Sequence, residues 1–204
     1  MRVKTEARRQ HIVDLAAEVF RELGFEGASM AEICARAGGS KATLYNYFPS
    51  KEALFFEVME QSCEAEFEAA YQAIDVAIDD IGEALQIFGE RFLGALYAPE
   101  VQAMRHLEIA SSGKTELGRL IYERGVLRSQ ALVAEALSAA MARGKLRRAD
   151  PAIVTRQLYA LLEAELIDRF LFQLPGAVGP DEIRGVTARA VAVFMAAYGP
   201  APGA

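Results

Sequence analysis

Several residue types that mark other classes of protein are scarce in this chain of 204 residues. Tryptophan is missing, and there are only two cysteines, Cys34 and Cys63, and two histidines, His11 and His106. The cysteines lie far apart, without a CxxC spacing or a neighbouring histidine, so the sequence predicts neither a disulfide framework nor a zinc site. We therefore expect no metal and no cofactor, and a reducing cytoplasm as the location.

Long hydrophobic runs are missing as well. No segment approaches the roughly 18 uninterrupted apolar residues of a membrane-spanning helix. The charged start of the chain, up to Arg9, has no apolar run behind it as a signal peptide would. Hydrophobic residues make up 52% of the chain and charged residues 25%, which is typical of a folded protein rather than a disordered one. We expect no membrane partner.

Signatures of catalysis are also lacking. The motifs G-x-S-x-G and H-E-x-x-H do not occur, and two separated histidines cannot form a metal cluster. Gly113-Lys114-Thr115 matches the end of a phosphate-binding loop, but Glu108 stands where that motif needs its first glycine. An anion at this position would repel phosphate, and no strand precedes it. The sequence predicts that the protein is not an enzyme.

The net charge of −6 argues at first against a nucleic-acid partner. The charge is unevenly distributed, however. Residues 1–55 carry eight Lys or Arg against seven Asp or Glu, so the acidic excess lies beyond them. Four of these basic residues fall within the first ten positions. Charge therefore permits nucleic-acid binding by the N-terminal part of the chain without proving it.

Helical patterns run through the whole chain, and no sustained alternation of β-branched residues predicts a strand. Apolar residues at three- and four-residue spacing, from Ile12 to Leu23, predict a first helix over about residues 5–23, which Gly24 ends. The apolar spacing and the positions of proline and glycine predict later helices over 51–80, 81–97, 99–111, 115–143, 151–173 and 180–198.

Residues 29–48 have the pattern of two short helices joined by a tight turn. Ser29 and Glu32 fit a capping box, in which each satisfies a backbone amide of the other. Gly38-Gly39 predicts the turn, and Ser40 is a suitable cap for a helix from residue 41 to 48. Two such helices packed on a longer first helix are the plan of a helix-turn-helix.

Spacing predicts which side of the last of these helices is exposed. At about 100° per residue, Leu44 and Phe48 share one side and are expected to point inward. Small, hydroxyl, amide and cationic groups are left on the outer side, and they suit the major groove of DNA. These residues are Lys41, Ala42, Thr43, Tyr45 and Asn46. Lys51, at the start of the next helix, combines an ammonium group with unpaired backbone amides, which favours phosphate.

Residues 24–33 and 37–54, which include Lys41-Ala42-Thr43-Leu44-Tyr45-Asn46-Tyr47-Phe48-Pro49, closely resemble the DNA-binding domain of the tetracycline-repressor (TetR) family. The resemblance implies a homodimer that binds double-stranded operator DNA. It implies phosphate contacts from Ser29 and the amides after it, starting with Met30, and from Ser40, Tyr45, Tyr47 and Lys51. It implies base or sugar-phosphate contacts from Lys41, Ala42, Thr43 and Asn46. Gly39 belongs to the same site but departs from the family pattern, which usually has a small apolar residue such as valine there.

Three regions follow from the helices and the resemblance together. The fold class is all-α, with an N-terminal three-helix helix-turn-helix domain and a C-terminal helical domain for ligand binding and dimerisation. We expect the first domain over residues 1–52, the second over 53–199 and a flexible tail over 200–204. The stretch 105–147 is similar to the C-terminal domain of AefR-like repressors, a branch of the same family.

The C-terminal domain is expected to serve two purposes. Helices that are apolar on more than one side must be covered on more than one side, and in the family the last two helices pair two subunits. The expected interface residues are Leu158, Leu162, Leu166, Val186, Ala190 and Phe194; the alternative is that they form intramolecular core.

The C-terminal domain is also expected to hold a pocket for a small hydrophobic effector. The side chains that can line it are Phe88, Phe92, Met104, His106, Tyr122 and Phe170. Such residues at helical spacing are more often core.

The sequence as a whole predicts a dimeric DNA-binding transcriptional regulator. Its expected action is that of a repressor released from a palindromic operator by a small-molecule effector. Two alternatives stay open. One is a DNA-binding protein of the same fold without a small-molecule ligand, and the other is a helical protein-interaction module, which the acidic net charge favours.

Overall fold

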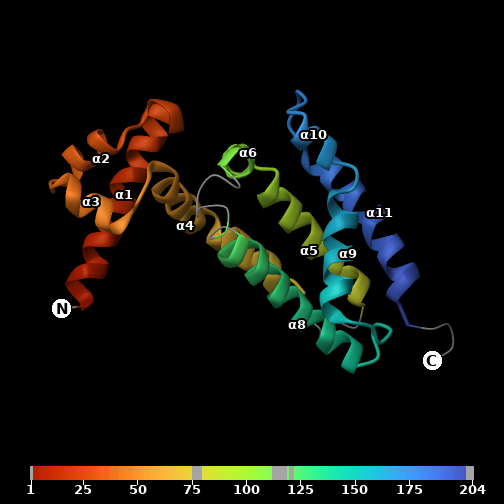
Figure 1. Ribbon diagram of the computed structural model, residues 1–204. Coiled ribbons are helices and arrows are strands. Elements are labelled where there is room, and N and C mark those ends of the chain that lie inside the picture. Colours follow the sequence, from red (N-terminus) through yellow and green to blue (C-terminus); the bar gives the residue numbers. More distant parts are fainter. Residues whose placement is uncertain (1, 75–79, 112–118, 120–121, 201–204) are drawn as a thin grey trace. The chain divides into compact units, whose positions relative to one another are not determined.

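A computed structural model describes residues 2–74, 80–111, 119 and 122–200, and the elements assigned within them are all helices (Figure 1). This confirms the all-α fold class. In chain order the bounds are α1 (Arg2–Gly27), α2 (Met30–Ala37), α3 (Lys41–Tyr47), α4 (Lys51–Gln72), α5 (Ile81–Leu96), α6 (Pro99–Ser111), the π-helix η1 (Tyr122–Leu127), α8 (Arg128–Ala142), α9 (Pro151–Glu163), α10 (Ile167–Leu171) and α11 (Pro180–Tyr198).

The chain divides into two compact units, which are described one at a time below. The first unit comprises Met1–Cys63 with His106–Gly118, and the second comprises Glu64–Arg105 with Arg119–Ala204. The boundary expected between residues 52 and 53 stays a prediction. The expected tail falls almost entirely on 201–204, which lie outside the described residues, as does the first part of the helix expected over 115–143.

The first unit is built around the apolar stripe of α1. Ile12, Ala16 and Val19 are buried at 0–1% exposure, and so are Ile33 of α2 and Leu54 of α4. Gly24 interrupts α1 with a φ of 70°, which a residue with a Cβ rarely adopts, so regular helix ends where the sequence predicted. Leu23 was expected in the stripe but is 47% exposed, because the helix breaks directly after it.

The second unit contains one hydrophobic core, to which α5, α8, α9 and α11 all contribute (Figure 1). Asp80 caps α5 and Asp150 caps α9, each by accepting hydrogen bonds from backbone amides of the first turn. Gly89 allows the backbone of α5 to come close to its neighbours, since a Cβ there would lie 2.5 Å from Cγ2 of Thr187 and 2.8 Å from Cδ2 of Leu162.

Two expectations about the second unit need correction. The single helix expected over 151–173 is divided into α9 and α10, with a turn between them. The six residues expected to face a partner subunit are only 0–5% exposed within one chain, where they form part of the core: Leu158, Leu162, Leu166, Val186, Ala190 and Phe194. For these side chains the structure agrees with the alternative, in which they form intramolecular core.

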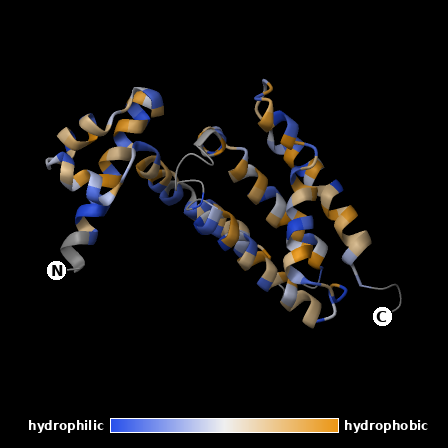
Figure 2. Ribbon diagram, viewed as in Figure 1, coloured by the Kyte–Doolittle hydropathy of each residue, from blue (hydrophilic) through white to orange (hydrophobic). Residues whose placement is uncertain are grey.

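Hydrophobic and hydrophilic residues lie side by side along the helices of both units, as Figure 2 shows. None of the helices in the described ranges combines the length and the hydropathy that crossing a membrane requires.

Candidate nucleic-acid interface

The caps of α2 and α3 define the start of each short helix. Ser29 Oγ accepts a hydrogen bond from the Glu32 amide at 3.1 Å, as the capping box predicts. The Glu32 carboxylate, however, accepts from Nε of Arg36 at 2.9 Å, so the reciprocal half of the box was wrong. Ser40 Oγ accepts from the Thr43 amide at 3.1 Å and lies 2.9 Å from the Thr43 hydroxyl.

The exposed side of α3 agrees with the spacing argument. Leu44 and Phe48 are 3% and 2% exposed, so they point into the unit. Of the five residues of the predicted face, Lys41, Ala42, Tyr45 and Asn46 are exposed and Thr43 is half-buried, as is Tyr47, which the family resemblance adds. Of the other expected contact residues, Ser29, Gly39 and Ser40 are exposed and Met30 is half-buried. Whether these side chains contact DNA stays a prediction.

Lys51 does not have the free ammonium group that its position suggested. Its Nζ donates to the carbonyl oxygen of Phe25 at 2.7 Å and to that of Ala28 at 3.1 Å. The same nitrogen lies 4.2 Å from the ring centroid of Phe25, in cation–π geometry. Lys51 therefore fastens the start of α4 to the segment that precedes α2. An ammonium group has three N–H donors, so one remains for the phosphate contact that the family resemblance implies.

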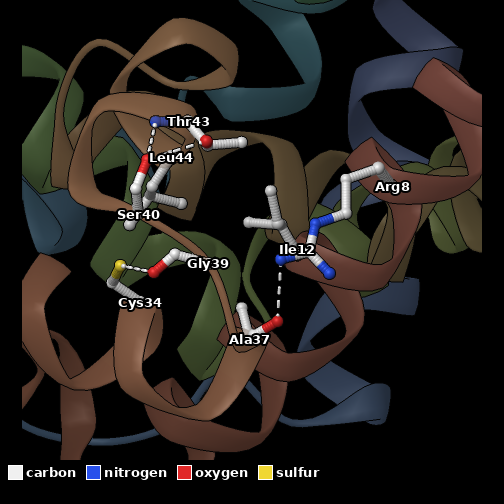
Figure 3. Close-up of a pocket in the computed structure, with 8 residues that line it drawn as sticks. All are labelled: Arg8, Ile12, Cys34, Ala37, Gly39, Ser40, Thr43 and Leu44. Atoms are coloured by element: carbon white, nitrogen blue, oxygen red, sulfur yellow. Dashed lines mark hydrogen bonds between the residues drawn. The ribbon is translucent and has the colours of Figure 1, made fainter.

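Arg8 is a residue of this unit that the sequence reasoning missed. Its Nη2 donates to the carbonyl oxygen of Ala37 at 2.9 Å (Figure 3) and to that of Gly38 at 3.0 Å. These carbonyls end α2 and begin the turn to α3, where Gly38 has a φ of 64°. The only sequence signal was the cluster of basic residues near the N-terminus, which names no partner.

Figure 3 shows the small pocket that lies between Arg8 and the turn. Arg8 and Ile12 line it from α1, and Cys34 and Ala37 line it from α2. Its volume of about 10 Å³ is close to what one water molecule needs, so it is too small for an organic ligand. The Cys34 thiol donates to the carbonyl oxygen of Gly39 at 3.1 Å, which gives the turn a second contact to α2.

A second group of contacts joins α1 to α4. Arg9 Nη2 lies 2.5 Å from Oε2 of Glu57, whose side chain is only 7% exposed. The hydrogen bond to this carboxylate raises the pKa of Arg9 above its usual value. One turn along, Gln10 and Gln61 exchange side-chain hydrogen bonds, with donor–acceptor distances of 2.8 and 3.3 Å. The helix α1 is therefore bonded to the first half of α4.

The residues expected to line an effector pocket have different surroundings. Phe88, Phe92 and Phe170 lie in the core of the second unit at 0%, 7% and 2% exposure. Met104 is half-buried, and Tyr122 is 52% exposed on η1. His106 is half-buried and falls in the first unit rather than the second. The structure thus brings three of the six side chains into one cluster, and a pocket there stays a prediction.

A polar group, which contains Arg105, Glu163 and Tyr97, lies beside the core residue Phe170. Arg105 Nη2 donates to Oε1 of Glu163 at 2.8 Å, and the Tyr97 hydroxyl donates to the same oxygen at 3.3 Å. The guanidinium carbon lies 4.0 Å from the ring centroid of Phe170. Arg105 Nη1 is buried and has no hydrogen-bond partner among the described residues. Burial, and then the charge of Glu163, raise the pKa of Tyr97.

Comparison with known families gives both parts of the chain the same assignment. Residues 12–58 match the model described as bacterial regulatory proteins of the tetR family. Residues 83–200, more than half of the chain, match the model of the C-terminal domain of AefR-like transcriptional repressors. The chain belongs to the TetR family. The resemblance seen in the sequence is thereby confirmed, and this family consists of transcriptional regulators rather than enzymes.

Individual relatives agree with the assignment of this TetR-family chain. It is 32% identical over 123 residues to the HTH-type transcriptional regulator UidR of Escherichia coli K12. The matched segment covers 57% of this chain and 62% of UidR. It is 42% identical over 55 residues to the HTH-type transcriptional regulator RutR of the same strain. Here the matched segment covers 27% of this chain and 26% of RutR. These curated relatives therefore match over less than two thirds of their own length.

Solved structures match over nearly the whole TetR-family chain. A protein from Mesorhizobium loti MAFF303099, described as a TetR-family transcriptional regulator, superimposes with a TM-score of 0.81 at 27% identity, over 96% of this chain and 98% of that one. The flavonoid-responsive regulator FrrA superimposes with a TM-score of 0.68 at 29% identity, over the same shares of the two chains. The two-unit helical architecture is thus shared along the chain's length.

Proposed function

We propose that this chain is a transcriptional repressor that binds a palindromic DNA operator as a homodimer through the exposed side of α3. The observation that carries the proposal is the division of α3 into two sides. Leu44 and Phe48 are buried, while Lys41, Tyr45 and Asn46 are exposed. A two-fold dimer presents two such helices to successive major grooves about 34–36 Å apart, or a multiple of that, which requires an inverted repeat in the DNA.

Selection of random duplexes by the purified protein, followed by sequencing, tests this function. The expected result is an inverted repeat whose half-sites are separated by about one or more helical turns of 10–10.5 base pairs. Sedimentation of the free protein should give a dimer. A monomer, or a protein that retains no duplex even at low ionic strength, would contradict the proposal.

Two substitutions on α3 are expected to have different effects on DNA binding. Asn46→Ala removes an amide that can pair with adenine, so we expect a loss of about 1–3 kcal/mol of binding free energy and relaxed sequence preference at one position. Tyr45→Phe removes only a hydroxyl that contacts phosphate, so binding to all duplexes should weaken by a similar factor. Titration of selected and scrambled duplexes in a gel-shift assay measures both. Glu135→Ala, at an exposed position of α8, is the control and should leave both affinities unchanged.

The proposed dimer must use residues other than the six first expected, because those are buried in one chain. Ile153 of α9 and Val193 of α11 are apolar and still 49% and 55% exposed. Both lie on the helices that pair subunits according to the family resemblance. Covering such side chains by a second copy would remove apolar surface from water and stabilise the pair. We therefore assign the partner surface to the outer sides of α9 and α11.

The proposed effector is a flat aromatic compound bound within the second unit. FrrA, whose name describes it as flavonoid-responsive, superimposes over 98% of its length. In this chain the rings of Phe92 and Tyr159, which are less completely buried than Phe88, lie 4.9 Å apart, and Tyr159 bonds to Ser129. Rings and hydroxyls of this kind recognise aromatic, hydroxylated ligands. An effector releases DNA only to the extent that it binds the two states differently, typically by about 1–3 kcal/mol.

A second candidate is a regulator of the same fold that needs no small molecule. The observation that favours it is the burial of Phe88 and Phe170 at 0% and 2% in a packed core. Thermal-shift measurements with the flavonoid naringenin, combined with operator titrations, distinguish the two candidates. Stabilisation together with weaker DNA binding supports effector release. Stabilisation without any change in DNA affinity favours the second candidate.

A further inference from the structure

The turn between α2 and α3 is held from α1 by a single side chain. Arg8 Nη2 donates to the carbonyl oxygen of Ala37 (Figure 3) and also to that of Gly38. Carbonyl groups at the C-terminal end of a helix lack intrahelical partners and carry the negative end of the helix dipole. A guanidinium group satisfies two of them at once and has the favourable sign of charge. Sequence separations of 29 and 30 residues make this a tertiary contact that orients α2 and its turn on α1.

Gly39 provides the space that this contact requires. A Cβ at residue 39 would lie 2.7 Å from Nη2 of Arg8, closer than such atoms approach in proteins. The positive φ of the turn belongs to Gly38, and Gly39 is not among the glycines with positive φ. Its backbone conformation therefore does not demand glycine. A side chain at position 39 would instead displace the guanidinium group of Arg8, which can move away because it is the end of a flexible side chain.

We propose that Arg8 is a positioning residue for α3, and that Gly39 is its matched partner. The inference rests on the proposed binding of DNA by α3. The turn that Arg8 holds leads directly to the cap residue Ser40 and so sets where α3 begins. A recognition helix has to be held to within about half an ångström of its productive position. A small apolar residue such as valine, which the family resemblance leads one to expect at position 39, would displace this arginine, whereas glycine leaves room for it.

Four variants, titrated with a selected duplex and a scrambled one, test the proposal: Arg8→Ala, Arg8→Lys, Gly39→Ala and the double variant Arg8→Ala/Gly39→Ala. Loss of a hydrogen-bonded guanidinium should weaken specific binding about tenfold in Arg8→Ala. Gly39→Ala should reproduce this loss, because it displaces the same group. The double variant should lose no more than either single variant, since the contact can be lost only once. If the loss of specific binding in the double variant equalled the sum of the losses in Arg8→Ala and Gly39→Ala, the two residues would act independently and the pairing would be overturned.

The salt dependence of binding separates positioning from direct phosphate contact. A phosphate contact by Arg8 predicts that Arg8→Ala lowers the salt slope by about one and that Arg8→Lys restores binding. Positioning predicts an unchanged slope and only partial rescue by lysine, whose single ammonium group cannot reproduce the planar fork of the guanidinium. The proposal would be overturned if Arg8→Lys bound DNA as tightly as the parent protein while Arg8→Ala showed a reduced salt slope.

Amide hydrogen exchange without DNA makes the test independent of the proposed function. The amides of Thr43 and Leu44 bond to Ser40 at the start of α3. Both should exchange several-fold faster in Arg8→Ala and Gly39→Ala than in the parent, while amides in the middle of α1 stay unchanged and show that the unit is folded. Unchanged exchange at both positions would refute the inference. A parent protein that binds no duplex would refute the proposed function instead.

Discussion

Glu57→Ala is expected to lower the free energy of unfolding by about 2–4 kcal/mol, just below the range for removing one partner of a fully buried ion pair. The Glu57 side chain is 7% exposed and lies 2.5 Å from the guanidinium group of Arg9. Without it, Arg9 keeps the more distant Glu6 carboxylate, at 3.9 Å, and the face of the Phe48 ring, whose centroid lies 5.2 Å from the guanidinium carbon. The expected loss lies below that range because the Arg9 side chain is 26% exposed, so water can partly solvate it. Urea denaturation followed by circular dichroism measures the loss.

Two further variants show whether the charge is responsible. Glu57→Gln keeps the size of the side chain and one acceptor oxygen, so we expect it to recover part of the loss. The double variant Arg9→Met/Glu57→Met replaces both charges by apolar groups and should be more stable than Glu57→Ala, because no cation is left without its partner. A loss below 1 kcal/mol in Glu57→Ala would show that the pair contributes little.

This ion pair also affects how α4 can move. Arg9–Glu57 and the reciprocal pair Gln10–Gln61 join consecutive residues of α1 to residues one turn apart on the same side of α4. Residues of α4 beyond Cys63 belong to the second unit. A tilt of α4 would therefore either break these bonds or carry α1 with it. The same substitutions can then be used to ask whether an effector changes DNA affinity through this contact.

Local patterns were sufficient to predict the helix-turn-helix. Caps depend on residues two or three positions apart, and Ser29 and Ser40 cap the expected helices. The inward direction of Leu44 and Phe48 follows from the helical period alone, and both are buried. Each of these features is decided within one turn of helix, so the printed sequence contains all that is needed.

Long-range partners were beyond the reach of such patterns. Lys51 was expected to have a free ammonium group because its neighbours in sequence form a helix start, yet its acceptors lie 23 and 26 residues away. The residues of the C-terminal helices were misplaced for a related reason. Periodicity shows that Leu158 or Phe194 must be covered, but it does not say whether a helix of the same chain or of a second copy covers them.

Phe88→Ala is expected to cost about 3–5 kcal/mol of unfolding free energy, because it removes a large side chain from a packed core. Phe88 is 0% exposed and contacts three other rings, those of Tyr71, Phe92 and Tyr159, at centroid distances of 5.5–6.4 Å. Thermal and urea unfolding of the variant give the loss, which should appear without any effector present.

Phe172→Ala is the matched control, since this phenylalanine is 72% exposed and should change stability by no more than about 0.5 kcal/mol. The size of the loss in Phe88→Ala then decides what the ring does. A loss of 3–5 kcal/mol is the cost of removing core, whereas a ring that lines an open pocket lacks contacts on one side and should cost much less. A small loss of stability together with a lost response to naringenin would therefore place Phe88 at the wall of the effector site, and would overturn its assignment to the core.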